Sequence, residues 1–321
     1  MSRDFDPHDL TDGLAGLKPK SKEPNSARVL DVWIAQAEQT LGNPEGGRLS
    51  WLVATTIVAA KLQQIVDGQD ASRFLLKGGT MLQHRLGLVT RATKDLDALV
   101  RGDIDDFLAV MDQTLSVPWG PVEFRRNGVE IIEIPSRVVK PRKFDVILML
   151  RGKTWRKIRV EISPDEGEAG STPELFAAPS LAGFGLPTPD HLVSLAMSYQ
   201  IAQKVHAASD LHNPPTFIND RVRDVVDLVL LRSLAKEAGE PSPQDILRAL
   251  KDTFNSRAAE SKQLGRPERL WPARIVALNH WEADYGYAAK SVGVDLTLEA
   301  AVVLVNSWLD ELDQAGGDQV K

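Results

Sequence analysis

Apolar residues recur at helical spacing near the start of the chain and again in its last third. After a polar opening over residues 1–26, steps of three and four from Ala27 predict a helix that stops at Gly42. The same pattern predicts a helix over Leu49–Val66 and returns from Pro189 onward. The helices predicted in this last part are Leu192–Ala208, Val222–Ala235, Ser242–Phe254, Pro272–Tyr285 and Thr297–Leu312.

The middle of the chain has the pattern of strands. Short apolar or alternating runs, separated by turn residues, are typical of a sheet. They are Phe74–Leu76, Asp95–Val100, Val122–Arg125, Glu130–Ile134, Phe144–Leu150 and Ile158–Ile162, with a short helix over Met81–Leu86. We therefore expect an α/β (α+β) fold in three parts: a flexible arm over 1–26, a mixed part over 27–186 and a helical part over 187–321.

Composition narrows the chemistry that such a fold can carry out. The 321 residues include no cysteine, which excludes a thiol nucleophile, a thiolate zinc site, an iron–sulfur cluster and a disulfide scaffold. No run approaches the roughly 18 apolar residues of a membrane span, and the start of the chain lacks the apolar core of a signal peptide. We expect a cytoplasmic protein with no membrane partner, whose chemistry rests on carboxylates and oxygen-preferring metals.

A glycine turn and a pair of aspartates form the first candidate site. Gly78 and Gly79 precede Thr80, where we expect a helix to begin, and backbone N–H groups at a helix start bind phosphate. Asp95 and Asp97 lie two residues apart on a predicted strand, so their side chains project to the same face. Two carboxylates placed in this way favour a divalent cation between them.

A third carboxylate would complete this arrangement, and two residues compete for the role. Glu161 is flanked by apolar residues on a predicted strand, and Asp145 has a similar position on the strand before it. A carboxylate in such a strand is costly unless it is paired or binds a metal. It can help to deprotonate an attacking hydroxyl or to complete a two-metal site.

The helical part carries a second group of charged residues. Asp224 and Asp227 are three residues apart, and Arg223 precedes Asp227 by four, so they share one face of the predicted helix. Exposed ion pairs would explain this spacing. The nearly continuous apolar residues of 225–231, however, predict a buried helix, in which charged side chains need a partner or a function.

Five segments together resemble a known family. They are LLKGGTML, RATKDLD, KIRVEIS, IAQKVHA and RVRDVVDL, and they span about Phe74 to Leu231. Their order and spacing are similar to those of the AbiEii and MenT nucleotidyltransferase toxins of the DNA polymerase β-like superfamily, found in abortive-infection and toxin–antitoxin operons. The resemblance implies a polymerase-β-like core with a mixed sheet within 27–186, and a helical C-terminal domain over 187–321 that completes the active site.

The resemblance also implies roles for individual residues. Asp95 and Asp97 match the metal-binding carboxylates, and Glu161 matches the third strand position better than Asp145, although the family often has Asp there. Lys204 matches a lysine that contacts the triphosphate, and Asp224 matches the downstream catalytic aspartate. The residues expected to line the nucleotide are Lys77, Gly78, Gly79, Thr80, Thr93, Arg221, Arg223 and Asp227; Arg223 replaces the lysine of the family motif.

The implied activity is transfer of a nucleoside monophosphate from an NTP, with Mg²⁺ or Mn²⁺, to an RNA acceptor such as the tRNA 3′ end. An antitoxin from the same operon is the implied partner. Two alternatives stay open at this point. One is transfer to a protein hydroxyl, and the other is a relative that binds a nucleotide or a partner without catalysis.

The distribution of charge favours the RNA acceptor more than the net charge does. The formal net charge of −6 argues against a nucleic-acid partner. Residues 121–160, however, contain eleven Lys or Arg and four acids, and residues 71–94 carry five bases and, between Ala71 and Lys94, no acid. Positive charge is thus concentrated in the part of the chain that would hold the triphosphate and an RNA end.

Overall fold

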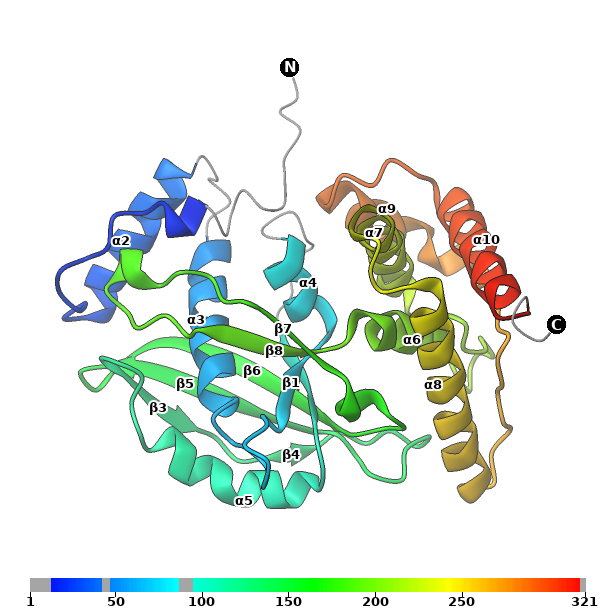
Figure 1. The fold of residues 1–321 in the computed structure, drawn as a ribbon, viewed down its shortest axis with the longest axis horizontal. Helices are drawn as coiled ribbons and strands as arrows, with labels where there is room; N and C mark the ends of the chain where they lie inside the picture. Colours follow the sequence, from blue (N-terminus) through cyan, green and yellow to red (C-terminus); the bar gives the residue numbers. More distant parts are fainter. Residues whose placement is uncertain (1–12, 42–46, 87–94, 318–321) are drawn as a thin grey trace. The chain divides into compact units, whose positions relative to one another are not determined.

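A computed structural model describes residues 13–41, 47–86 and 95–317 of the chain (Figure 1). The chain divides into two compact units. We call the first the sheet unit; it comprises Met1–Ile134, Val139–Asp165 and Pro173–Ser194. The second, the helical unit, comprises Pro135–Val138, Glu166–Thr172 and Leu195–Lys321.

The sheet unit is built on one mixed sheet with the strand order β3-β5-β6-β2-β1-β8-β7, and β4 pairs with β5. β2 runs parallel to β6 and β1 runs parallel to β8, whereas β5 is antiparallel to β3, β4 and β6, and β1 is antiparallel to β2. The strands are β1 (Phe74–Leu76), β2 (Asp95–Val100), β3 (Val122–Arg126), β4 (Glu130–Ile131), β5 (Arg142–Leu150), β6 (Lys153–Pro164), β7 (Pro173–Ala177) and β8 (His191–Leu195).

The central strand β6 separates the apolar core from a polar face. Ile158, Val160 and Ile162 are buried, and the residues between them are not, because side chains alternate between the two faces of a strand. The buried face belongs to one core with the apolar side chains of three helices, α2 (Ala27–Thr40), α3 (Arg48–Leu62) and α5 (Ile104–Leu115). The helix α4 (Gly78–Leu86) packs against β2.

The helical unit packs α6 (Met197–Ala208) against α7 (Val222–Ala238) and α8 (Pro243–Gln263). The Ser242 hydroxyl caps α8 by accepting a hydrogen bond from the backbone N–H of Asp245, and Pro243 is the first residue of the helix. The short helix η4 (Asn279–Trp281) leads into α9 (Glu282–Ser291), and α10 (Leu298–Gly317) packs on α7 and α8. Among the described helices, none is both long and apolar enough to cross a membrane.

Two predicted helices are wrong at their N-terminal ends. The predicted helix Leu192–Ala208 begins as strand β8, which pairs with β1, and α6 starts only at Met197. A short buried apolar run fits a strand and a helix equally well by periodicity, and here its place in the sheet between β1 and β7 decides. The predicted helix over Pro272–Tyr285 is not helical before Asn279, because the Ile275 backbone exchanges hydrogen bonds with the Asn306 side chain of α10.

Other differences concern segments to which no element was assigned. α5 and β7 were not predicted, although Asp103 caps α5 by accepting from two backbone N–H groups. The flexible arm predicted over residues 1–26 packs on the sheet unit in its described part, 13–26. Leu14 is buried in the core, and the Lys20 N–H donates to the Ala182 carbonyl beside η3 (Ala182–Phe184).

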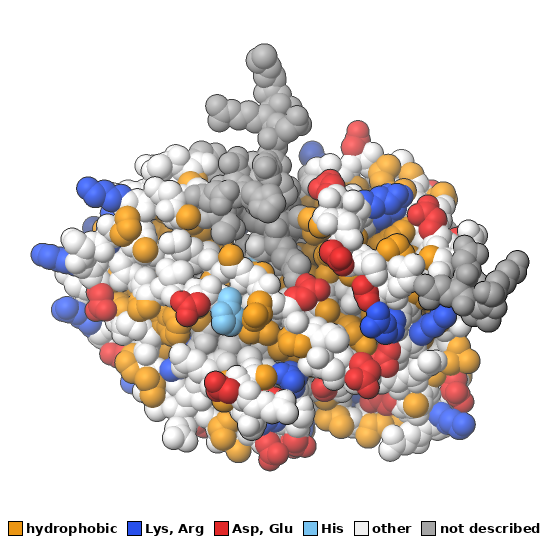
Figure 2. Space-filling model, in the orientation of Figure 1, with side chains coloured by type: hydrophobic (Ala, Val, Ile, Leu, Met, Phe, Trp, Pro, Cys, Tyr) orange, Lys and Arg blue, Asp and Glu red, His pale blue; other side chains and the backbone are white. Residues whose placement is uncertain are grey.

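The surface shows how the charges are spread. On the face drawn in Figure 2, acidic, basic and apolar side chains are interspersed over the described residues. The described residues on this face form no continuous basic patch.

Candidate active site

The turn between β1 and α4 is built directly against Asp97. Gly78 has φ +64, and a Cβ at this position would lie 2.6 Å from Oδ2 of Asp97. Both the backbone conformation and the space therefore require glycine. The N–H of Lys77 donates to the Asp97 carbonyl at 2.9 Å, so the glycine turn and the aspartate strand are fixed to one another.

The glycine motif differs in one respect from its prediction. Helix α4 begins at Gly78, two residues before Thr80, so the two glycines form its first turn. Thr80 is buried, and its hydroxyl donates to the Asp95 carbonyl at 3.0 Å. Thr80 thus anchors the start of β2. Gly78 and Gly79 are left as the residues whose N–H groups begin the helix.

Three carboxylates stand on the polar face of neighbouring parallel strands. Asp97 of β2 is the register partner of Glu161 on β6, and Asp95 is the partner of Arg159. Residues opposite each other in such a ladder project to the same face of strands about 4.8 Å apart. We call Asp95, Asp97 and Glu161, all half-buried, the carboxylate row.

Within the carboxylate row, the surroundings of Glu161 disfavour its negative charge. Burial raises the pKa of Glu161, and the charge of Asp95 raises it further, while Lys143, Arg159 and Lys77 act in the opposite direction. The net shift is upward, which means that the ionised form of Glu161 is disfavoured. An added cation at this place would relieve the repulsion.

The alternative third carboxylate, Asp145, lies one strand farther from β2, opposite Arg159 on β6. It is 5% exposed and is already neutralised by Lys157 at 2.7 Å and Arg159 at 3.4 Å. Asn127 donates a further hydrogen bond to it at 2.9 Å. Burial would raise the pKa of Asp145, but hydrogen bonds and charge from Lys157 and Arg159 outweigh it and lower that pKa. Asp145 therefore has partners of its own within the sheet.

The donor set of the carboxylate row fits a divalent cation that also binds phosphate. Within residues 13–41, 47–86 and 95–317, no three His, Asp or Glu side chains converge as a ready metal-binding group. Mg²⁺ differs from zinc in this respect, because it is usually held by one or two carboxylates together with water and substrate phosphates. Oxygen ligands and the disfavoured charge of Glu161 suit such an ion, and the adjacent α4 N-terminus suits the phosphate that it would bind.

In the helical unit, the predicted residues Lys204, Asp224 and Asp227 form one buried cluster. The Lys204 Nζ of α6 donates to Asp224 Oδ1 at 2.8 Å and to Asp227 Oδ2 at 2.6 Å. All three residues are buried, because α6 packs against the apolar face of α7. Arg221 lies 3.8 Å from Asp224 and is exposed, as is Arg223. Asp224 and Asp227 of α7 thus form a buried ion cluster with Lys204 of α6, and the exposed Arg221 and Arg223 lie close to Asp224 in the chain.

Asn219 fixes the segment that leads into α7, and sequence reasoning gave it no role. Its side-chain amide donates to the carbonyls of Ala208 at 3.3 Å and Asp210 at 2.8 Å, which lie at the end of α6. Its side-chain oxygen accepts from the Arg221 N–H at 3.0 Å. Because Asn219 ties the end of α6 to the start of α7, it sets the spacing of Lys204 and Asp224.

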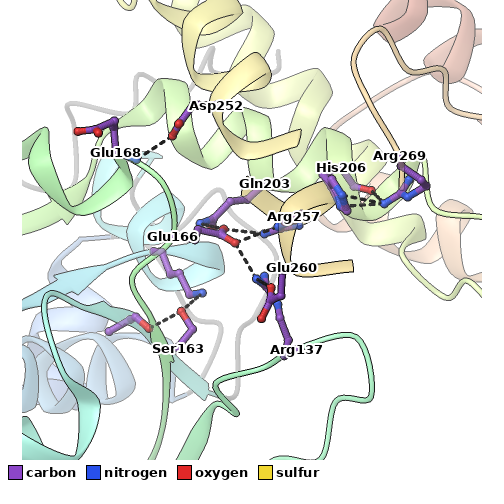
Figure 3. A network of polar contacts seen from close by, with 12 residues as sticks. Arg137, Ser163, Glu166, Glu168, Gln203, His206, Asp252, Arg257, Glu260 and Arg269 are labelled. Atoms are coloured by element: carbon purple, nitrogen blue, oxygen red, sulfur yellow. Dashed lines mark hydrogen bonds and ion pairs between the residues drawn. The ribbon is translucent and has the colours of Figure 1, made fainter. Parts of the chain in front are cut away.

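A second charged network surrounds Glu166, as Figure 3 shows. Arg257 donates to both of its oxygens, at 3.0 and 2.7 Å, and Arg137 and Gln203 donate at 2.8 and 2.7 Å. Arg137 also donates to Glu260 at 3.0 Å. These contacts hold two loop segments, 135–138 and 166–172, on α6 and α8. No sequence motif marks them, because their members are far apart along the chain.

The predicted site residues therefore fall into two groups. The glycine turn and the carboxylate row belong to the sheet unit, and the cluster of Lys204, Asp224 and Asp227 belongs to the helical unit. Thr93 lies outside the described residues.

Comparisons with known proteins identify the family. The family described as nucleotidyl transferase AbiEii toxin, type IV toxin–antitoxin system, matches residues 61–308, which is more than half of the chain. No curated protein matches the chain significantly. Among solved structures, the chain is similar to MenT4, a nucleotidyltransferase toxin from Mycobacterium tuberculosis H37Rv. The identity is 21%, the match covers 88% of this chain and 98% of that one, and the TM-score is 0.46.

The match spans the segments that carry the resemblance seen in the sequence, from the glycine turn of the sheet unit to the charged helix of the helical unit. Membership implies an NTP as substrate and an antitoxin as partner. The chain belongs to the AbiEii family of nucleotidyltransferase toxins of type IV toxin–antitoxin systems.

Proposed function

We propose that this toxin transfers a nucleoside monophosphate from an NTP to the 3′ end of an RNA in the cytoplasm, with tRNA as the acceptor, in a reaction that depends on Mg²⁺ or Mn²⁺. The observation that carries the proposal is the pairing of Asp97 with Glu161 and its contact with Gly78. One short region of the chain thereby brings together carboxylate oxygens and the N-terminus of a helix. A metal–triphosphate requires both.

The carboxylate row would hold the metal. Asp95 and Asp97 are the proposed ligands, with Glu161 beside them. When bound, the ion supplies positive charge at the phosphate oxygens and favours attack by the acceptor hydroxyl. The N–H groups that begin α4 at Gly78 and Gly79 would bind phosphate oxygens directly, since a helix N-terminus favours negative charge.

Lys204 is proposed to neutralise the triphosphate as pyrophosphate leaves. Asp224 and Asp227 would hold its ammonium in one position by the two hydrogen bonds described above. Arg221 and Arg223, both exposed and close to Asp224 in the chain, would add positive charge near this cluster. In this arrangement Asp224 and Asp227 act through Lys204.

An RNA acceptor is favoured over a protein hydroxyl by the exposed bases on the face that carries the carboxylate row. Arg159 and Lys157 precede Glu161 on β6 by two and four residues and lie on the same face. Their side chains are 52% and 57% exposed. Lys143 is the register partner of Glu161 on β5 and is 38% exposed. Lys157 and Arg159 share Asp145, and Lys143 pairs with Glu130. These bases therefore leave one positive charge in excess, which would attract a phosphate backbone that ends at the carboxylates.

The test is incubation of the protein with Mg²⁺, each α-³²P-labelled NTP and total tRNA. Label in the RNA fraction is expected, and it should be lost in the Asp95→Asn and Asp97→Asn variants. Label on protein would instead support the alternative acceptor. If neither fraction is labelled and the two variants remain as toxic to cells as the wild type, catalysis is not the source of toxicity.

A further inference from the structure

Lys77 makes one hydrogen bond through its backbone and another through its side chain. The side-chain contact, with Ser163, has no role in the arrangement described so far. The backbone N–H of Lys77 donates to the Asp97 carbonyl at 2.9 Å, and its Nζ donates to the hydroxyl of Ser163 at 2.7 Å. Ser163 is labelled in Figure 3. A lysine has three donors on a flexible four-carbon chain, so a second fixed contact restricts where its charge lies.

Ser163 belongs to the same face of β6 as Glu161. It is the register partner of Leu99 on β2, one same-face step beyond the pair of Asp97 and Glu161. The ammonium of Lys77 is therefore fixed at the end of the carboxylate row. Its charge reaches Glu161, whose pKa it lowers against the larger effects of burial and of Asp95.

The position of Lys77 along the chain also favours phosphate binding at this turn. Lys77 directly precedes Gly78, where the N–H groups of α4 begin. A fixed ammonium and a helix N-terminus at one turn both favour phosphate oxygens. The carboxylates attract a cation and Lys77 attracts an anion, so a metal-bound polyphosphate would satisfy both.

We propose that Ser163 is a positioning residue that fixes the Lys77 ammonium for binding the phosphate chain of the NTP. The proposal rests on the proposed function and deepens it. It gives the sheet unit a phosphate-binding cation of its own, in addition to Lys204 of the helical unit. The Ser163 hydroxyl also donates to the Ala98 carbonyl of β2 at 3.4 Å, but its proposed effect on phosphate binding is exerted through Lys77 and should vanish when Lys77 is absent.

The experiment measures binding of inorganic tripolyphosphate in the presence of Mg²⁺ by titration calorimetry, because this probe has no base or sugar. Ser163→Ala should weaken binding about tenfold, the effect of losing one charge-assisted hydrogen bond. Ser163→Thr keeps the hydroxyl and should bind as the wild type does. Thr154→Ala, an exposed hydroxyl on the same strand, is the matched control and should have no effect.

A double-mutant cycle separates positioning from a structural role. Lys77→Met should weaken binding, and Lys77→Met with Ser163→Ala should bind no more weakly than Lys77→Met alone. Thermal unfolding of each variant monitors folding. In the transfer assay, Ser163→Ala should raise the KM for the NTP and leave kcat nearly unchanged.

The outcomes for this inference and for the proposed function are distinct. If Ser163→Ala binds tripolyphosphate as tightly as the wild type, or if the two substitutions are additive, the positioning role is wrong even when the wild type transfers nucleotides. If Ser163→Ala binds weakly as expected but the wild type labels neither RNA nor protein, the positioning role holds and the proposed function fails. A wild type that does not bind tripolyphosphate overturns the inference.

Discussion

Gly78 approaches Asp97 so closely that an added Cβ would lie 2.6 Å from the Oδ2 atom of that aspartate. The glycine turn and strand β2 are therefore in close contact, which is possible because Gly78 has no side chain. A change at the turn acts on the carboxylate, although the two residues are nineteen positions apart in the sequence.

Gly78→Ala should abolish nucleotide transfer and lower the free energy of unfolding. An alanine at φ +64 costs about 1–3 kcal/mol, and its Cβ would displace the Asp97 carboxylate. Urea unfolding and the labelled-NTP assay measure the two effects. Gly68→Ala is the control, since no atom lies within 4 Å of a Cβ built there. Equal activity of the two variants would contradict the proposed role of this contact.

Glu161→Gln and Asp145→Asn should have opposite effects. Glu161→Gln replaces a carboxyl group whose ionised form is disfavoured, so the protein should keep its stability and lose transfer activity. Asp145→Asn leaves Lys157 and Arg159 without their shared carboxylate and should cost about 1–3 kcal/mol of stability.

Stability and transfer activity of the two variants also decide which residue, Glu161 or Asp145, is the third carboxylate of the site. If Asp145→Asn abolishes transfer at full stability while Glu161→Gln remains active, Asp145 has the role proposed here for Glu161. A loss of activity in both variants at unchanged stability would mean that both strands contribute.

Lys204→Met should destabilise the helical unit and abolish transfer. It leaves two buried carboxylates without the ammonium that bridges them, a change that typically costs about 3–5 kcal/mol. Removing one of the negative charges as well, in Lys204→Met with Asp227→Asn, should recover part of the stability but none of the activity. Lys236→Met, an exposed lysine of α7, serves as the control. Activity of the double variant would show that Lys204 is only structural.

The strands of the site could be predicted because their side-chain pattern is local. The bounds of β1 and β2 follow from short apolar runs, and Asp95 and Asp97 share a face by their spacing alone. The choice between Glu161 and Asp145 could not be made in this way. It depends on which strand pairs with β2, and strand order is a property of the whole sheet.

The helical unit was harder to predict for a related reason. The spacing of Asp224 and Asp227 fits an exposed helix face as well as a buried one. Only the packing of α6 against α7 shows that Lys204 is their partner. The Glu166 network has no local signal either, since Arg137, Arg257 and Glu166 come from three distant segments.

Glu166→Gln should lower the stability of the helical unit by about 3–5 kcal/mol. The carboxylate of Glu166 is 8% exposed and accepts hydrogen bonds from Arg137 and Arg257; Arg257 would lose this counterion, and Arg137 would keep only Glu260. Glu168→Gln, an exposed acid two residues away, is the matched control. Urea unfolding of both variants gives the comparison. Similar stability of the two would mean that the guanidinium groups find other partners when Glu166 is neutral.

His206 should make the folded state sensitive to acid. It is packed against Phe254 at 4.7 Å between ring centres, and its ring lies 2.8 Å from Arg269. Its pKa is lowered from 6.5 to about 2, chiefly by burial; Arg257, Arg269 and Arg137 act in the same direction, and Glu166 opposes them. The unfolded chain therefore binds a proton near pH 6.5 that the folded chain refuses. Below that pH the free energy of unfolding should fall by up to about 1.4 kcal/mol per pH unit from this group.

His206→Gln keeps an acceptor for Arg269 but cannot take up a proton. Its free energy of unfolding should therefore depend on pH less steeply than that of the wild type. The difference between pH 4.5 and 6 corresponds to about one proton fewer taken up on unfolding. Urea unfolding at several pH values measures both slopes, and carboxylates that titrate in the same range cancel in the difference. Identical slopes would mean that the folded protein protonates His206, and hence that the ring can leave its contacts with Phe254 and Arg269 without unfolding.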